Sequence, residues 1–294
     1  MAAGAMGIAR SSSGAQALVS PTVFGHVVGL TGLTPEGAVA EAHAGLLAQA
    51  SGARLTLYHA CDLSGVEQHS HGPHQMHDMR MAAERLARAT LEGEAQTTGV
   101  VRARRQVVVE RRSPTAATMA AVVRRLGADI VVMAPHDRGI LSRALGFSLT
   151  EATVERLEGA VPVLCARGEA RPYHRILVPT DFSAGSRRSF RLAARLAGLF
   201  GATVTVLHAV AHPADAEGAI ASLRRFVPRE LARRAPRLVV EAGEPCAVIL
   251  SMAKAIDADL VVLSTGGRDS LRDAVLGTHA QRVIRNAPCP VLVS

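Results

Sequence analysis

The feature that most constrains this chain is an internal repeat. Three segments of the first half recur in the same order in the second half, and each contains a run of β-branched residues typical of a buried strand. Two halves with the same order of segments must build the same sheet twice. The boundary is predicted at residues 168–172 (GEARP), a polar stretch with glycine and proline. The matching pairs are residues 52–59 with 201–208, 127–133 with 257–263, and 161–164 with 289–292.

Strands and helices are predicted to alternate along the second half. Short apolar runs are followed by longer stretches whose leucines recur every three or four positions, as on one face of a helix. Such alternation gives a parallel sheet covered by helices on both faces, and Gly201 is placed to end the first helix in the left-handed conformation. We expect strands over residues 175–179, 203–208, 238–241, 260–263 and 291–293, and helices over 184–200, 247–256 and 278–286.

The candidate site follows the fourth of these strands. Four small residues, Ser264 to Gly267, come directly after the apolar run, and nine residues separate Gly267 from the pair Gly277-Thr278 at the start of a helix. Small residues let main-chain N–H groups approach an anion closely, and a helix N-terminus adds unpaired N–H groups. The spacing therefore indicates a cradle for phosphate groups.

These residues also carry a family resemblance. The pattern small-x-x-Gly, nine residues, Gly-Thr and a helix ending in residues 287–293 (APCPVLV) resembles the ATP-binding signature of the universal stress proteins. The first position of that signature is usually glycine, whereas this chain has Ser264, whose Cβ would lie near the ligand. The resemblance covers nearly all of residues 22–294, so the chain is similar to the tandem, two-domain members of the family.

The resemblance implies a fold, a ligand and a set of contacts. The fold is α/β, with two repeated doubly wound parallel five-stranded sheets of the adenine nucleotide alpha hydrolase-like (Rossmann-like) type and strand order 3-2-1-4-5. The ligand is ATP, ADP or AMP, bound where the strand order reverses, and the function is regulation or protection under stress. The implied nucleotide-binding residues are Pro179, Thr180, Asp181, Ala209, Leu263, Ser264, Gly267, Gly277, Thr278, His279 and Ala280.

Asp181 is the strongest single candidate among these residues. In the family, the Asp after the first strand contacts the adenosine part of the ligand, and a carboxylate can accept hydrogen bonds from ribose hydroxyls or an exocyclic amine. The alternative is that Asp181 only caps the following helix. Ala209 is assigned by resemblance to a backbone contact with the base, and His279 to the neighbourhood of a terminal phosphate or to a capping role.

The first half departs from this pattern at each position. Gly32 stands where the second half has Asp181, and residues 134–137 (APHD) replace the small-residue loop. Pro135 has no N–H to donate, and Asp137 places a carboxylate where phosphate would lie. Residues 146–148 (GFS) are bulky at the closing pair. We predict that this half does not bind ATP in the usual way.

The predicted organisation has three parts. Residues 1–20 form a disordered tail, residues 21–168 a first universal stress domain with a degenerate site, and residues 172–294 a second domain with the ATP site. The resemblance implies that the two halves pair through their final strands, near residues 161–166 and 290–294, as an intramolecular pseudo-dimer. A further homodimer and an unidentified protein partner are left open.

Composition narrows the functional classes. Of the residues, 48% are hydrophobic and 20% charged, and no apolar run approaches the length of about 18 residues that spans a bilayer. A cytoplasmic, soluble protein without a membrane partner is expected, since the 4 cysteines form no paired motif. The net charge of +8 comes mostly from arginines dispersed along the chain, because Lys254 is the only lysine, and this favours no specific nucleic-acid partner.

Other chemistry has less support in the sequence. A histidine-rich segment at residues 59–78 could suit zinc or nickel but matches no metal signature, so no metal is assigned. No catalytic residues are assigned, and the chain is at most a weak ATPase. Two alternatives are kept: a slow ATP-hydrolysing or adenylating enzyme that uses residues 266–270, similar to a PP-loop, and an interaction module that has lost its nucleotide.

Overall fold

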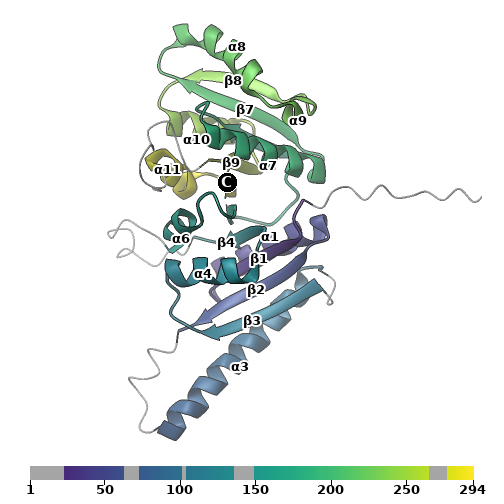
Figure 1. Ribbon diagram of the computed structural model, residues 1–294, viewed down its shortest axis with the longest axis vertical. Coiled ribbons are helices and arrows are strands. Elements are labelled where there is room, and N and C mark those ends of the chain that lie inside the picture. Colours follow the sequence, from purple (N-terminus) through teal and green to yellow (C-terminus); the bar gives the residue numbers. More distant parts are fainter. Residues whose placement is uncertain (1–22, 63–72, 101–103, 136–148, 265–276) are drawn as a thin grey trace, which may run out of the picture.

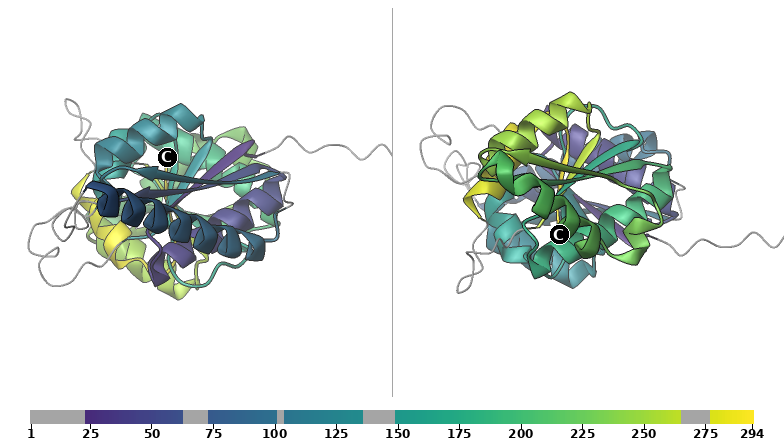
Figure 2. Two further views of the ribbon diagram at one scale, coloured as in Figure 1. Left: turned by 90° about the horizontal axis from the view of Figure 1, so that it is seen from below. Right: turned by 90° about the horizontal axis from the view of Figure 1, so that it is seen from above.

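A computed structural model describes residues 23–62, 73–100, 104–135, 149–264 and 277–294 of the chain. It shows one continuous sheet with helices on both faces, and the two halves of the chain form the two ends of the long axis (Figure 1). The end-on views show helices on both sides of the twisted strands (Figure 2). No helix of these residues is long and apolar enough to cross a membrane.

Each half contributes five strands to this sheet. The elements of the first half are β1 (His26–Thr31), α1 (Pro35–Ser51), β2 (Arg54–Cys61), α3 (Pro73–Thr97), β3 (Arg105–Arg111), α4 (Ala116–Leu126), β4 (Ile130–Met133), α6 (Leu149–Leu157) and β5 (Val163–Cys165). Those of the second half are β6 (Arg175–Pro179), α7 (Ala184–Phe200), β7 (Thr203–Val210), η2 (Pro213–Asp215), α8 (Ala216–Phe226), α9 (Arg229–Ala232), β8 (Arg237–Ala242), α10 (Pro245–Ala255), β9 (Leu260–Leu263), α11 (Thr278–Asn286) and β10 (Val291–Val293).

The strand order is β3-β2-β1-β4-β5-β10-β9-β6-β7-β8. Within each half the order is 3-2-1-4-5 with parallel pairing, so the predicted fold class is confirmed. The strands and helices expected in the second half are all present, and β6, α7, β9, α11 and β10 have the predicted bounds. Strand β7 continues to Val210 because that residue still pairs with Ala242 of β8.

The repeat also includes an aspartate carboxylate that accepts hydrogen bonds from main-chain N–H groups at the start of each half. The Asp129 carboxylate accepts hydrogen bonds from the main-chain N–H groups of Gly25 and His26, at 2.7 and 2.9 Å. The Asp259 carboxylate accepts the equivalent bonds from His174 and Arg175, at 3.1 and 2.9 Å. Each aspartate precedes the fourth strand of its half and fixes the beginning of the first strand beside it. This is why the segments ADIVVM and ADLVVL recur.

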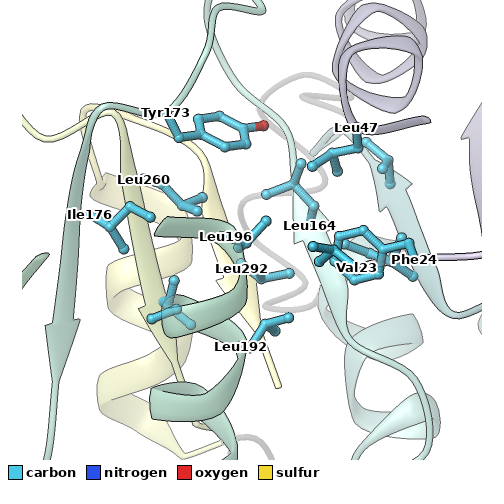
Figure 3. Packing of buried hydrophobic residues seen from close by; sticks show 14 of the residues in the cluster. Val23, Phe24, Leu47, Leu164, Tyr173, Ile176, Leu192, Leu196, Leu260 and Leu292 are labelled. Atoms are coloured by element: carbon cyan, nitrogen blue, oxygen red, sulfur yellow. The ribbon is translucent and has the colours of Figure 1, made fainter. Parts of the chain in front are cut away.

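The two sheets meet at the final strands of the halves. β5 and β10 pair antiparallel, with Leu164 opposite Leu292, and this is the only antiparallel pairing among the described strands. Apolar residues from both halves pack into one cluster there, with Leu164 and Phe24 of the first half facing Leu196 and Leu292 of the second (Figure 3). We call the boundary between the halves the seam.

Candidate functional site

The strand order of the second sheet reverses between β6 and β9, and the candidate site is predicted at the carboxyl ends of these two strands. β6 pairs with β9 on one side and with β7 on the other, so the connections from these strands leave in opposite directions. Such a reversal opens a crevice above the strand ends. Thr180 and Asp181 follow β6, and Ser264 follows β9. The topology therefore brings these sequence-predicted residues to one edge of the sheet.

Asp181 lies in a hydrogen-bonded turn that begins α7. Its Oδ1 accepts from the Ser183 main-chain N–H at 2.9 Å and from the Ser186 hydroxyl at 3.0 Å. Burial raises the pKa of this carboxyl, but the hydrogen bonds from Ser183 and Ser186 outweigh it and hold the pKa below its usual value. Asp181 is therefore ionised at neutral pH. The N-cap itself is Ser183, whose side chain accepts from Ser186.

The turn around Asp181 is held in place by aromatic packing. Phe182 has a positive φ of 63°, and its ring packs against His208 and Phe226, with ring centroids 4.2 and 5.3 Å apart. The His208 Nδ1 donates to the Thr180 carbonyl oxygen at 2.7 Å. Sequence reasoning did not assign His208 a role, although its recurrence as His59, which contacts the Thr31 carbonyl oxygen at 3.0 Å, is a visible signal.

The other predicted wall of the site is the N-terminus of α11. The N-cap of α11 is Gly277, which has no side chain to accept a capping hydrogen bond. The main-chain N–H groups of the first turn therefore receive no hydrogen bond acceptor from the N-cap side chain. Thr278 and His279 are exposed, whereas Ala280 is buried. The His279 Nδ1 lies 3.0 Å from a carboxylate oxygen of Glu244, the N-cap residue of α10. His279 is thus engaged in a contact between α10 and α11.

The C-terminal end of α11 is fixed by residues of the first half. The buried Glu151 carboxylate of α6 forms a two-pronged ion pair with Arg285, at 2.6 and 2.7 Å. The Arg167 guanidinium donates to the carbonyl oxygens of Ile284, Arg285 and Ala287, at 2.7, 3.1 and 2.6 Å. These contacts satisfy carbonyl groups that a helix end leaves without partners. The helix that presents Thr278 is therefore positioned across the seam.

The remaining predicted residues are found as follows. Pro179 and Leu263 are buried at the ends of their strands, and Ala209 is half-buried in β7, opposite Glu241 of β8. Gly267 lies outside the described residues, as does most of the loop that joins β9 to α11. The described part of the site therefore consists of the Asp181 turn, the end of β9 and the first turn of α11.

The first half has a pocket at the corresponding edge of its sheet. The pocket has a volume of about 430 Å³ and lies beyond the ends of β1, β2 and β4. Gly32, Thr34, Glu36, His59 and Asp62 are among its lining residues, and the described lining includes no arginine or lysine. Pro135 follows β4 directly, whereas Asp137 and residues 146–148 lie outside the described residues. The degenerate character of this site stays a prediction.

A buried carboxyl group lies beneath this pocket. The Thr31 hydroxyl, which lines the pocket, donates to Glu41 of α1, and the Glu41 residue is 3% exposed. Burial and the neighbouring Glu94 carboxyl raise the pKa of Glu41 to about 8. Glu41 is therefore protonated at neutral pH, and it has no counterpart of this kind at Ser189 or Phe190 of α7.

The histidine-rich segment does not form a metal centre within the described residues, which contain no cluster of three or more metal-ligating side chains. His59 belongs to β2, where its ring contacts the Thr31 carbonyl oxygen. His74 and His77 are exposed on α3, and His69 and His71 lie outside the described residues. Nothing in this segment changes the assignment of the candidate site to the second half.

The family model described as "Universal stress protein family" matches twice, over residues 24–167 and over residues 172–294. A universal stress protein of Methanocaldococcus jannaschii is 33% identical over 138 residues, which cover 41% of this chain and 81% of the relative. A universal stress protein of Thermus aquaticus is 30% identical over 131 residues, 40% of this chain and 96% of the relative.

Solved structures match the two halves together. A universal stress protein from Archaeoglobus fulgidus has a TM-score of 0.69 and 17% sequence identity, and the match covers 94% of this chain and 97% of that one. At this identity the likeness concerns the fold. It extends over both halves of the chain, in contrast to the two sequence relatives, each of which matches the length of one half.

Proposed function

Because this chain belongs to the universal stress protein family and carries two of its domains, we propose that its C-terminal half binds ATP or another adenine nucleotide in order to regulate or protect under stress. The proposal is supported by two features of the second half: an ionised Asp181 follows β6 beside the strand-order reversal, and α11, which follows β9, begins at Gly277 without a side-chain cap. A nucleotide needs both an acceptor for its sugar or base and donors for its phosphates.

The residues present fit such a ligand. The first-turn N–H groups of α11, beginning at Thr278, would donate to phosphate oxygens, aided by the positive end of the helix dipole. The Asp181 carboxylate would accept hydrogen bonds from ribose hydroxyls or from an exocyclic amine. His208 and Phe182 act as positioning residues, since they hold the turn that presents Asp181.

The proposal gives α11 a role in regulation. Its first turn faces the nucleotide, and its last turn is bound to Glu151 and Arg167 of the first half. A ligand that orders the first turn would therefore stabilise contacts across the seam. We propose that the paired halves act together as the unit that a protein partner recognises.

We also propose that the protein is cytoplasmic, because all four cysteines are buried free thiols, as a reducing compartment permits.

The proposal is tested by equilibrium dialysis with labelled ATP, ADP and AMP, together with nucleotide analysis of the freshly purified protein. The wild-type chain should retain one nucleotide, and Asp181→Ala should weaken binding by about tenfold, the loss of one or two hydrogen bonds to a charged group. Asp215→Ala, which removes an exposed carboxylate from η2, is the matched control and should bind as the wild type does.

Two other results would each replace the proposal. No retention of any adenine nucleotide at high micromolar concentration would select the interaction module. Turnover of ATP well above background that is abolished by replacing Asp269 would select an ATP-hydrolysing or adenylating enzyme. Asp181→Asn provides a check on folding, since the amide oxygen can still accept from the Ser183 N–H and should keep the start of α7 intact.

A further inference from the structure

The helix α3 exposes apolar side chains on the side that faces away from the sheet. Figure 1 shows α3 at one end of the long axis, beside the edge strand β3. The inner side of the helix buries Ala87, Leu91 and Ala95. The two large apolar side chains that are exposed in the described part of the chain are Met79, at 41%, and Leu86, at 71%, and both belong to α3. The helix therefore carries apolar surface that the described chain does not cover.

These two residues belong to a row along one side of the helix. Successive residues of an α-helix are about 100° apart, so positions 79, 82, 86, 89 and 93 fall within a sector of about 80°. Their spacing alternates between three and four residues, as do the a and d positions of a coiled coil. We call this row the outer face of α3. Its members are all exposed: Met79, Ala82, Leu86, Ala89 and Gly93.

Gly93 has no role in the packing of the described chain. It lies inside α3, and a Cβ atom there would meet nothing within 4 Å beyond its own stretch of helix. A glycine inside a helix costs about 1 kcal/mol relative to alanine. A small residue is useful where a second backbone approaches closely, and Ala82 and Ala89 are also small. The outer face therefore combines two projecting side chains with three positions that leave room for them.

The residues beside the outer face indicate which partner fits it. On one flank lie Arg85 and Glu92, which are seven residues apart and exposed. Neither forms an ion pair among the described residues. The other flank has Ala83 and Thr90, which are uncharged. A second copy of α3 that runs antiparallel offers the opposite charge to each charged residue of this flank.

Two alignments of an antiparallel pair bring most of the outer face into contact. In the first, Leu86 faces Ala89 of the second copy, and Arg85 of each copy lies beside Glu92 of the other. In the second, Leu86 faces Ala82, and the two Arg85 side chains lie beside each other. Like charges held together across an interface oppose association. The charges therefore select the first alignment, which contains two pairs of opposite charge.

We propose that two copies of this chain associate through the outer faces of their α3 helices, antiparallel about a two-fold axis, with Arg85 of each copy paired with Glu92 of the other. The outer face extends over about 21 Å. Such a short contact lies at the low end of protein interfaces, so the dimer should dissociate on dilution. The surface belongs to the first half and does not depend on the proposed nucleotide site.

Sedimentation velocity from micromolar to submillimolar protein concentrations tests the proposal. The wild type should shift from monomer to dimer as its concentration rises, and a wild type that stays monomeric throughout would overturn the proposal. Arg85→Glu and Glu92→Arg each place like charges together, so each should raise the dissociation constant by about tenfold or more. The double variant Arg85→Glu, Glu92→Arg restores opposite charges and should dimerise as the wild type does. Arg224→Glu, the same charge change on α8, is the control and should leave the constant unchanged.

Two variants of the outer face test the apolar contact itself. Leu86→Gln removes an exposed apolar side chain, and Gly93→Gln places a long side chain where Ala82 of the second copy would pack. Both should raise the dissociation constant by about tenfold or more, although Gly93→Gln should stabilise the helix. Thermal unfolding of each variant checks that the fold is retained. A dimer that tolerates these two changes and both single charge reversals forms through another surface, and the proposal would then be wrong.

Discussion

The turn after the first strand has the same backbone in both halves but carries different side chains. Leu33 and Phe182 both have positive φ, 52° and 63°, and the residues after them, Thr34 and Ser183, both cap the first helix. The residue before them is Gly32 in one half and Asp181 in the other. The same turn geometry therefore presents a carboxylate in the second half and no side chain in the first.

The two halves also differ in what lies beneath the turn. In the first half, Thr31 donates to the buried, protonated Glu41. In the second half, Thr180 accepts from the Phe182 N–H at 3.1 Å, and Ser186 donates to Asp181. The first half thus buries a neutral acid, whereas the second holds an ionised, half-buried one directly after β6. This contrast predicts different responses to pH and to mutation.

The largest expected effect comes from breaking the contact that joins the halves. Arg285→Ala would leave the Glu151 carboxylate, whose side chain is 2% exposed, without its bidentate partner. Loss of one partner of a buried ion pair costs about 3 kcal/mol or more, so urea unfolding should show a loss of this size. Arg282→Ala, which removes an exposed partner of Glu244 on the same helix, should cost less than about 1 kcal/mol. Equal costs would contradict the assigned role of the seam.

The next largest effect is a pH dependence of stability that comes from Glu41 of the first half. The pKa of Glu41 is about 8 in the folded protein against an ordinary value of 4.5, so its contribution to stability is complete below pH 4.5 and is lost as pH rises to about 8. The free energy of unfolding should fall with pH across this window, by at most about 1.4 kcal/mol per pH unit.

Glu41→Gln tests this pH dependence directly. The amide oxygen can still accept from Thr31, and the amide does not ionise, so the slope across this window should flatten. Chemical denaturation at several pH values between 4.5 and 9 measures it. Glu36→Gln changes a carboxyl group of the same helix that is exposed and should leave the slope as it is. A wild-type slope retained in Glu41→Gln would assign the pH dependence to other groups.

The smallest effect distinguishes two equivalent histidines. His59→Ala and His208→Ala each remove one hydrogen bond to the carbonyl group at the end of a first strand, and each should cost about 1 kcal/mol of stability. Only His208→Ala should also weaken adenine-nucleotide binding, by a few-fold, because Phe182 packs on that ring and the turn carries Asp181. Dialysis of both variants against labelled ATP measures this difference, and a loss in His59→Ala but not in His208→Ala would assign the nucleotide to the first half.

Much of the fold follows from local sequence pattern. The strand at 260–263 and the helix at 278–286 were predicted with their observed bounds, because a β-branched run and a Gly-to-Pro span mark their limits directly. Between β7 and β8 no element was predicted, yet η2, α8 and α9 lie there. α8 packs beside β8 with a single buried leucine, Leu223, so its apolar pattern was too sparse to identify.

The candidate site was predictable in part. Asp181 and Gly277 were named from their places after a strand and before a helix, and they lie at those places. Asp181 accepts hydrogen bonds from Ser183 and Ser186 in the turn before α7, whose N-cap is Ser183, and the contact of Asp181 with a nucleotide stays a prediction. The contact of His279 with Glu244 could not be predicted, since the two residues are brought together only by the packing of α10 on α11.

The sequence by itself determined the repeat, the order of elements and the position of the changed residue at the end of each first strand. Those properties depend on short-range patterns of residues, which can be recognised in the sequence alone. Only the tertiary structure decided that Glu41 is protonated, that Arg167 and Glu151 hold α11, and that Met79 and Leu86 of α3 stay exposed. Each of these depends on which surfaces dock, because burial and counterions come from residues far apart in the chain.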